Sequence, residues 1–206
     1  NVPASAFSDL PSLKIINLAK NNITSVEPGA FDNSPNLQAI RLDTNKLMDI
    51  KGLFKNIPNL LWLNISGNNL EHLEYSNFPP RLQWLDLRSN QIRSLGSCLD
   101  LEKQLRLRNL DLSQNSLLEI GSSNLPDSIE NLILSENQIH TILPYTFFRK
   151  PNLTRVDLSF NHLTKIDPNA LRLSPDKTPP TEIFLGQNPL TCDCTMQWLQ
   201  NMNMEI

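Results

Sequence analysis

Few side chains of this chain have the type and spacing that catalysis needs. Asp86 and Asp111 occupy the same position in successive repeats, so they would form an adjacent carboxylate pair of the kind that glycosidases use. The open sheet that the repeats predict offers no cleft to exclude water or to raise the pKa of one carboxylate. The sequence has no glycine-rich phosphate loop and no Ser-His-Asp set that the repeat would bring together. We therefore expect that the protein is not an enzyme.

Cysteine and histidine side chains could instead bind a metal ion. Cys192 and Cys194 have Cys-x-Cys spacing, but a structural zinc site needs two further thiolate or imidazole ligands. His72, His140 and His162 are far away in sequence and on separate repeats. We expect His140 and His162 to face solvent. The sequence thus favours neither a metal ion nor any other cofactor.

A repeat with the frame LxxLxLxxNxL organises the chain, and the copy in residues 107–117 is the clearest. Spacings of 22 to 27 residues between its asparagines are typical of leucine-rich repeats. In such repeats each coil places a short strand at the LxL core, with the framing apolar side chains inward and the residues between them outward. The asparagines of the frame are Asn21, Asn45, Asn68, Asn90, Asn115, Asn137, Asn161 and Asn188.

The frame predicts an α/β leucine-rich-repeat solenoid. A curved parallel β-sheet forms its concave face, and loops and short helical turns form its convex side. An asparagine amide can both donate to and accept from backbone groups where the chain leaves the strand, so we expect a structural asparagine ladder. About eight coils are expected in residues 1–190, and a different terminal segment in residues 191–206. Phe7 and Leu10 match the back half of a coil whose strand would precede the chain.

Composition argues against several classes of partner. The net charge of −3, with mixed signs, provides no basic surface for a nucleic acid. No run of about eighteen apolar residues could cross a bilayer, so a membrane would be reached only through parts outside this chain. Cys98, between the fourth and fifth coils, is expected to be a buried free thiol.

The outward positions of the strands define a candidate binding face. One series, just before the LxL core, is Ile15, Ala39, Trp62, Trp84, Asn109, Asn131, Arg155 and Glu182. The other, inside the core, is Asn17, Arg41, Asn64, Asp86, Asp111, Ile133, Asp157 and Phe184. Neighbouring strands lie about 5 Å apart, so the rings of Trp62 and Trp84 can be in contact.

Adjacent like charges at Asp86 and Asp111 need compensation. Arg88 or Arg108 could supply it, and the alternative is a basic partner or a cation. A tryptophan pair beside acidic residues is typical of an interface, although the two rings could simply cover each other. The candidate protein-binding residues are Trp62, Trp84, Asp86, Arg88 and Asp111.

Three Asn-x-Ser/Thr triplets, at Asn22, Asn64 and Asn152, are candidate sites for N-linked glycans. Together with the cysteine pair they favour a secreted or cell-surface chain over an intracellular one. Asn64 points outward from the strand that carries Trp62, so a glycan there would shield this part of the sheet. Partners would then approach from a lateral edge.

Several strings resemble the ectodomain of insect Toll receptors, in particular the long-ectodomain subgroup that contains Tollo. They are residues 57–66, 125–130, 144–158, 169–175 and 192–199. The most specific are Phe-Phe-x-Lys-Pro-Asn-Leu-Thr-Arg-Val-Asp and Asn-Ala-Leu-Arg-Leu-Ser-Pro. The resemblance implies that residues 191–206 begin a cysteine-rich C-terminal cap. Cys192 and Cys194 would then form disulfides with cysteines beyond Ile206.

The same resemblance implies a function. The chain would be an extracellular protein-binding segment of a single-pass receptor in the plasma membrane, with a cytoplasmic Toll/interleukin-1-receptor domain that signals in innate immunity or development. Its partner would be a cystine-knot protein of the Spätzle, neurotrophin-like type or another cell-surface receptor, in a homo- or heterodimer. Two alternatives remain open. One is an adhesion, guidance or matrix protein without a signalling domain, and the other is a spacer between ligand-binding and membrane-proximal repeats.

Overall fold

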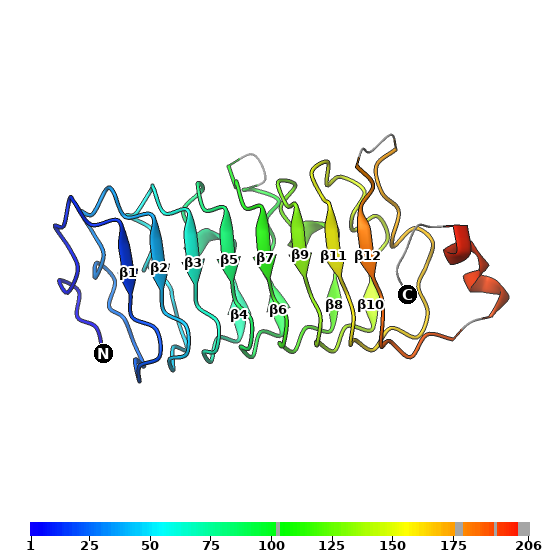
Figure 1. Cartoon of the computed structure of the whole chain (residues 1–206), viewed down its shortest axis with the longest axis horizontal. Helices are drawn as coiled ribbons and strands as arrows, with labels where there is room; N and C mark the ends of the chain where they lie inside the picture. Colours follow the sequence, from blue (N-terminus) through cyan, green and yellow to red (C-terminus); the bar gives the residue numbers. More distant parts are fainter. Residues whose placement is uncertain (102–103, 176–178, 192, 202–206) are drawn as a thin grey trace.

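The computed structural model describes residues 1–101, 104–175, 179–191 and 193–201, and it shows a solenoid of stacked coils (Figure 1). In this part of the chain, eight strands form one main sheet in the order β1-β2-β3-β5-β7-β9-β11-β12. All pairs in this sheet are parallel, because every coil returns to the same side before its next strand. The leucine-rich-repeat solenoid predicted from the asparagine frame is confirmed.

Each main-sheet strand is three residues long and is centred on an apolar residue of the frame. The strands are β1 (Ile15–Asn17), β2 (Ala39–Arg41), β3 (Trp62–Asn64), β5 (Trp84–Asp86), β7 (Asn109–Asp111), β9 (Asn131–Ile133), β11 (Arg155–Asp157) and β12 (Glu182–Phe184). The central residues, such as Ile40 and Leu63, are buried and in register with one another. Their two neighbours point to the opposite face, because side chains alternate along a strand.

The apolar side chains of the frame fill the inside of the coils. Leu110, Leu112 and Leu117 are each at most 1% exposed. Every coil buries these side chains against its neighbours, which gives the solenoid one continuous core. Part of that core is a row of phenylalanine rings with successive centroids 6.1, 6.3 and 6.2 Å apart, formed by Phe7, Phe31, Phe54 and Phe78.

The asparagines of the frame connect adjacent coils through hydrogen bonds. Asn115 Nδ2 donates to the carbonyl oxygens of Leu112 in its own coil and Leu87 in the preceding coil, both at 3.0 Å. Its Oδ1 accepts from the Ile92 N–H at 2.9 Å. The same pattern occurs at Asn45, Asn68, Asn90, Asn137, Asn161 and Asn188.

The residue before every asparagine of the frame has a left-handed backbone conformation, which directs the asparagine towards the inside of the coil. These residues have φ between +54° and +62°, and they are Lys20, Thr44, Gly67, Ser89, Gln114, Glu136, Phe160 and Gln187. Only glycine adopts this conformation without steric cost, so the hydrogen bonds of the ladder must offset some strain at the other positions.

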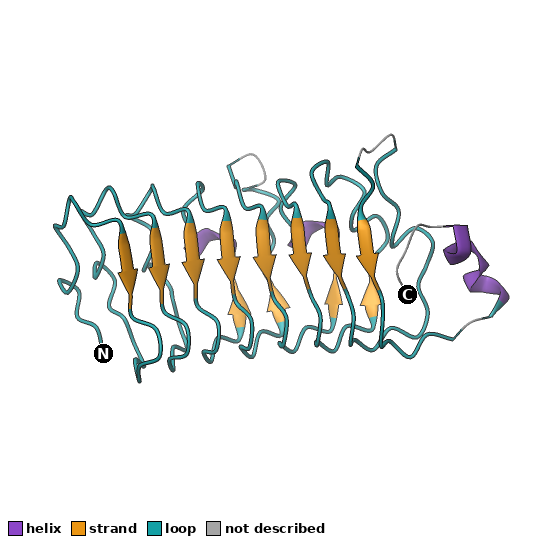
Figure 2. Cartoon of the chain, viewed as in Figure 1, coloured by secondary structure: helices purple, strands orange, loops and turns teal. Residues whose placement is uncertain are grey.

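The side opposite the main sheet carries short elements (Figure 2). β4 (His72–Leu73) pairs with β6 (Ser94–Leu95), and β8 (Glu119–Ile120) pairs with β10 (Thr141–Ile142). Two single 3-10 turns, η1 (Tyr75–Asn77) and η2 (Ser122–Asn124), are the short helical turns that the repeat predicts.

The segment after the last coil contains η3 (Cys194–Asn201), a 3-10 helix that lies beyond β12 in Figure 1. It buries Met196 and Leu199. Within the described residues, no helix has both the length and the apolar character that crossing a membrane requires.

Candidate functional site

The candidate functional surface is the face of the main sheet that points away from the core, here called the open face. It consists of the first and third residues of each main-sheet strand. Strand register aligns the first residues in a row from Ile15 to Glu182 and the third residues in a row from Asn17 to Phe184. Apart from Asp86, all these side chains are exposed or half-buried. The two rows have the members that the repeat frame predicts.

Trp62 and Trp84 stack face to face on the open face, with ring centroids 4.6 Å apart and ring planes at 6°. The centroid separation is close to the spacing of neighbouring strands, so the stack runs across the sheet. The outer face of Trp62 therefore points towards Ala39 on β2, its register partner. Trp84 is in register with Asn109 on its other side. Each ring thus covers one face of the other, and the stacking leaves the outer face of each ring uncovered.

Asp86 lies beside this pair in the second row and is only 3% exposed. Its Oδ1 accepts a hydrogen bond from the Arg88 N–H at 2.9 Å, and its Oδ2 is 3.7 Å from the Arg88 guanidinium. Burial raises the pKa of Asp86, the backbone N–H and guanidinium of Arg88 lower it, and neighbouring Asp111 raises it further. Arg88 is the compensating cation. Arg108, the other residue expected near Asp86, instead lies 3.6 Å from Glu130.

A local turn, which the sequence reasoning missed, explains all five amide and carboxylate residues in the second row. The side-chain oxygen accepts a hydrogen bond from the N–H two residues later in Asn17, Asn64, Asp86, Asp111 and Asp157. In three of these turns a serine hydroxyl also donates to the same oxygen. The signal was present as Asn/Asp-x-Ser at the end of the strand, a common turn pattern. These residues therefore shape the ends of β1, β3, β5, β7 and β11.

Arg155 and Phe184 form a second aromatic feature near the other end of the open face. The Arg155 guanidinium carbon lies 4.2 Å from the centroid of the Phe184 ring, within cation–π distance. Arg155 is also 3.6 Å from Asp157. The pair was missed because its members belong to different rows and are separated by the longest repeat interval. The frame aligns Arg155 with Glu182 and Asp157 with Phe184, and it does not show that the long Arg155 side chain crosses diagonally to Phe184.

The three candidate glycosylation sites lie at the surface to different degrees. Asn22 and Asn152 are exposed, and Asn64 is half-buried on β3. Asn64 Oδ1 accepts hydrogen bonds from the N–H and the hydroxyl of Ser66 at 2.9 and 2.7 Å. The asparagine and the serine of this sequon are thus in direct contact on the open face.

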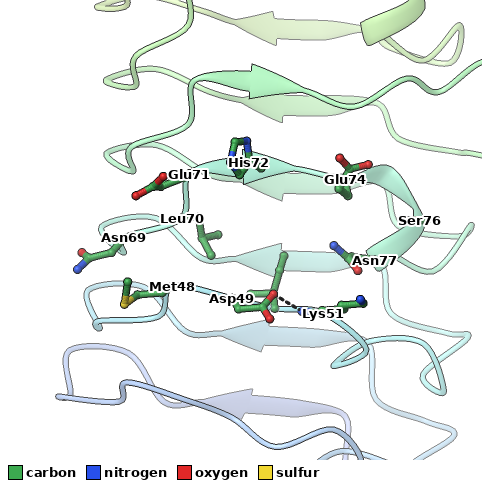
Figure 3. A pocket seen from close by; sticks show the side chains of 11 residues that line it. Met48, Asp49, Lys51, Asn69, Leu70, Glu71, His72, Glu74, Ser76 and Asn77 are labelled. Atoms are coloured by element: carbon green, nitrogen blue, oxygen red, sulfur yellow. Dashed lines mark hydrogen bonds between the residues drawn. The ribbon is translucent and has the colours of Figure 1, made fainter.

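A hollow of about 580 Å³ lies beside β4 (Figure 3). Asp49, Glu71, Glu74 and His72 are among its lining residues. The Nδ1 of His72 is 2.9 Å from the Ser94 hydroxyl. In the described part of the chain, no group of three or more His, Cys, Asp or Glu residues is placed to hold a metal ion.

The remaining candidate residues for chemistry lie apart from one another. His140 and His162 are exposed. Cys98 is buried, and its thiol donates to the Ser123 carbonyl oxygen at 3.2 Å. Cys194 is exposed, while Cys192, its expected neighbour in the cap, lies outside the described residues.

Sequence comparisons agree with this architecture. Residues 1–47, 105–163 and 127–175 match the family model described as leucine rich repeat, and together these ranges cover more than half of the chain. The chain is 45% identical over 163 residues to Toll-like receptor 7 of Drosophila melanogaster, which covers 78% of this chain and 11% of the relative. It is 31% identical over 172 residues to lumican of Gallus gallus, and the match covers 78% of this chain and 41% of lumican.

Other relatives share the same repeats in different proteins. The chain is 31% identical over 164 residues to human leucine-rich repeats and immunoglobulin-like domains protein 1, which covers 77% of this chain and 15% of the relative. A chain of the solved octameric complex of Latrophilin 3, Unc5D and FLRT2 superimposes with a TM-score of 0.69 at 22% identity, covering 95% of this chain and 70% of that one. That likeness shows the fold alone. The chain spans between 11% and 41% of the length of the three curated relatives.

Proposed function

Because the chain belongs to the leucine-rich repeat family, we propose that it is an extracellular segment that binds protein partners through the open face of its sheet. The observation that carries the proposal is the composition of this face. Its two rows present stacked tryptophans and an arginine–phenylalanine pair between polar neighbours. Aromatic and arginine side chains with polar surroundings dominate the binding energy of protein interfaces. A broad open sheet of this kind suits a protein surface better than a small substrate, which needs a concave pocket.

The finer part of the proposal is that the parent protein is a Toll-family transmembrane receptor on the cell surface. The 45% identity to Drosophila Toll-like receptor 7 and the Toll-like strings in residues 57–66 and 144–158 support it. By likeness, the partner is a Spätzle-type, neurotrophin-like cystine-knot protein or another receptor chain. We further propose that residues 1–190 form the repeats and that residues 191–206 begin a disulfide-bonded cap containing Cys192 and Cys194.

Surface plasmon resonance with an immobilised Spätzle-type cystine-knot protein tests the proposal. Trp84→Ala and Phe184→Ala remove the two aromatic features without touching the frame residues. We expect at least one of them to weaken binding by about tenfold or more, as truncation of an interface hot spot does. His140→Ala, an exposed change outside the open face, is the matched control. Unchanged affinity for both aromatic variants would contradict binding through the open face.

Two alternatives predict different results for the parent protein. A spacer would keep its ligand affinity but change its signalling when whole coils are deleted in register. An adhesion, guidance or matrix protein would bind a partner chain without being followed by a membrane span and a Toll/interleukin-1-receptor domain. The relatives support the receptor and the matrix possibilities unequally, because Toll-like receptor 7 matches at 45% identity and lumican at 31%.

A further inference from the structure

We propose that an N-linked glycan on Asn64 packs its first N-acetylglucosamine residue against the outer ring face of Trp62, above Ala39. The inference rests on the proposed extracellular location, because N-glycosylation belongs to the secretory route. The outer face of the tryptophan stack would then be covered by a glycan attached to this chain. It also directs the protein partner towards the end of the open face that holds Arg155 and Phe184.

The amide of Asn64 is held in an orientation that suits the modification. Its Oδ1 is occupied by the N–H and hydroxyl of Ser66, so its Nδ2, the atom that would carry the sugar, lies on the other side of the amide. Asn68, in the same coil, shows the opposite arrangement. Its Nδ2 donates at 3.0 Å to the carbonyl oxygens of Leu42 and Ile65, and the residue is 4% exposed. A sugar on Asn68 would break the ladder, whereas one on Asn64 leaves these bonds in place.

Trp62 is within reach of a sugar on Asn64. The two residues are the first and third of β3, so both side chains project from the open face. Their Cα atoms are separated by about 6.6 Å, two residue steps along a strand. Since the first sugar is bonded directly to Nδ2, it can lie back along the strand and contact the indole ring.

The space above Ala39 can receive that sugar. Register places Ala39, a small side chain, beside Trp62 on the side that the Trp84 ring does not cover. Arg41, the next outward residue of β2, is turned away, because its Nε and guanidinium nitrogen donate to the two carboxylate oxygens of Asp43 at 2.9 and 3.0 Å. On the far side Ile15 is 65% exposed. The negative face of an indole ring attracts weakly positive groups, and the C–H groups on one side of a pyranose ring are of this kind.

The covalent step uses a lipid-diphosphate-linked oligosaccharide as co-reactant. A bond forms between Asn64 Nδ2 and C1 of the first sugar while the C1–O bond to the diphosphate breaks. Nδ2 loses one proton and the lipid diphosphate leaves, so no oxidation or reduction is involved. Folding of β3 then brings the attached sugar beside Trp62.

Tryptophan fluorescence on the secreted chain tests the packing. The chain contains three tryptophans, so a Trp198→Phe background isolates the stacked pair. Glycopeptide mass spectrometry first establishes that Asn64 is occupied, and an endoglycosidase then trims each glycan to one N-acetylglucosamine. Ser66→Ala abolishes the sequon and keeps the backbone hydrogen bond to Asn64 Oδ1. Because the sugar would cover one of the two outer ring faces of the pair, we expect acrylamide quenching to be about twofold weaker in the glycosylated chain than in Ser66→Ala.

Two controls isolate the space above Ala39. Ser66→Thr preserves the sequon and should retain the protection. Ala39→Leu fills the space with a side chain, so adding Ser66→Ala to this variant should leave the quenching unchanged. Asn152→Gln removes a glycan that lies away from the open face and should have no effect on the pair.

The results separate this inference from the proposed function. Equal quenching of the glycosylated chain and Ser66→Ala, with Asn64 occupied, would overturn the packing. A bare Asn64 with occupied Asn22 and Asn152 would also overturn it, but would leave the extracellular location standing. In that case Trp62 and Trp84 would be available to the cystine-knot probe, and Trp84→Ala would be the more damaging binding variant.

Discussion

At the scale of single residues, polar side chains join the coils of this protein. Each central asparagine of the frame satisfies backbone groups on two coils that would otherwise be buried without partners. The residue before it is left-handed in every coil, and Gly67 is the one place where glycine provides that conformation. The hydrogen bonds of the asparagine therefore stabilise a strained turn as well as the contact between coils.

Replacing Asn115 with alanine should strongly destabilise the fold. The change leaves the carbonyl oxygens of Leu87 and Leu112 and the N–H of Ile92 without their side-chain partner. We expect a loss of at least about 2 kcal/mol in the free energy of unfolding, measured by urea denaturation with circular dichroism. Asn21→Ala is the matched control, because Asn21 is exposed and bonds Leu18 and Ala19 in its own coil. Its cost should stay below about 1 kcal/mol, and equal losses would contradict the ladder as the cause.

Asp86 makes the stability depend on pH. Its pKa in the folded protein is raised, mainly by burial, so the folded state binds the proton more tightly than the unfolded state. Stability contributed by this group is therefore lost as the pH rises from the usual aspartate pKa through the raised value. Asp86→Asn keeps an oxygen for the Arg88 N–H but cannot ionise.

We expect Asp86→Asn to unfold with a free energy about 0.5–1 kcal/mol higher than the parent at pH 7, because a neutral amide avoids both the burial of a charge and the repulsion from Asp111. Below the usual aspartate pKa the advantage should vanish. Urea denaturation across that pH range gives both values. Asp157→Asn is the control, because its register neighbours, Ile133 and Phe184, carry no charge. A gain that is the same at all pH values would show that ionisation is not responsible.

At the scale of elements, stacked side chains of one kind run along the solenoid as continuous rows. Phe31, Phe54 and Phe78 are buried, and their rings stack at nearly constant spacing inside successive coils. The Trp62–Trp84 pair repeats the arrangement on the open face. Rows form because parallel, in-register coils place equivalent residues one strand spacing apart, so that a side chain finds its best contact in the next repeat.

Phe54→Ala should disrupt the inner row. Phe54 is fully buried and has a ring neighbour on both sides, so its removal leaves a cavity between two coils. We expect a loss of about 3–5 kcal/mol, measured by thermal or urea unfolding. Phe7→Ala provides the comparison, since Phe7 is half-buried and stacks on Phe31 alone among the rings of the row. Its smaller burial predicts a loss of about 1–2 kcal/mol. Similar losses for both would show that the row does not act through burial on two sides.

At the scale of the whole molecule, the solenoid is a linear array. Each coil contacts its neighbours, and the main sheet joins strands that are adjacent along the array (Figure 1). Stability is then a sum of coil and interface terms, and a coil with one neighbour opens more easily than a coil with two. The linear stacking of the coils therefore accounts both for the long open face and for the local character of unfolding.

Amide hydrogen exchange should follow this gradient. Among the residues that the structure describes, β5 and β7 are paired on both sides, whereas β1 and β12 are paired on one side. We expect the amides of β1 and β12 to exchange with an opening free energy at least about 1–2 kcal/mol lower than those of β5 and β7. Mass-spectrometric exchange on the intact chain provides the comparison. Uniform protection along the array would indicate that the molecule opens as one cooperative unit.

The sequence alone determined the fold class and the membership of both outward rows. A repeat with a fixed frame specifies which side chains point inward in every coil, and the period fixes the register between coils. The contact between Trp62 and Trp84 followed from that register, as did the position of Asn64 on the same strand. Such inferences succeed because the neighbours of a residue in a solenoid lie one repeat away.

Tertiary structure decided which partners the long charged side chains contact. Lys150 is 1% exposed, and its Nζ lies 2.6 Å from Asp127 Oδ1 in the preceding coil, although a lysine in a loop gives no sign of burial. Arg88 rather than Arg108 compensates Asp86 because the turn after β5 carries Arg88 back to the carboxylate. Arg155 reaches Phe184 diagonally across two rows. Side chains this long can reach several partners. Which partner they contact depends on local backbone geometry, which a repeat frame does not encode.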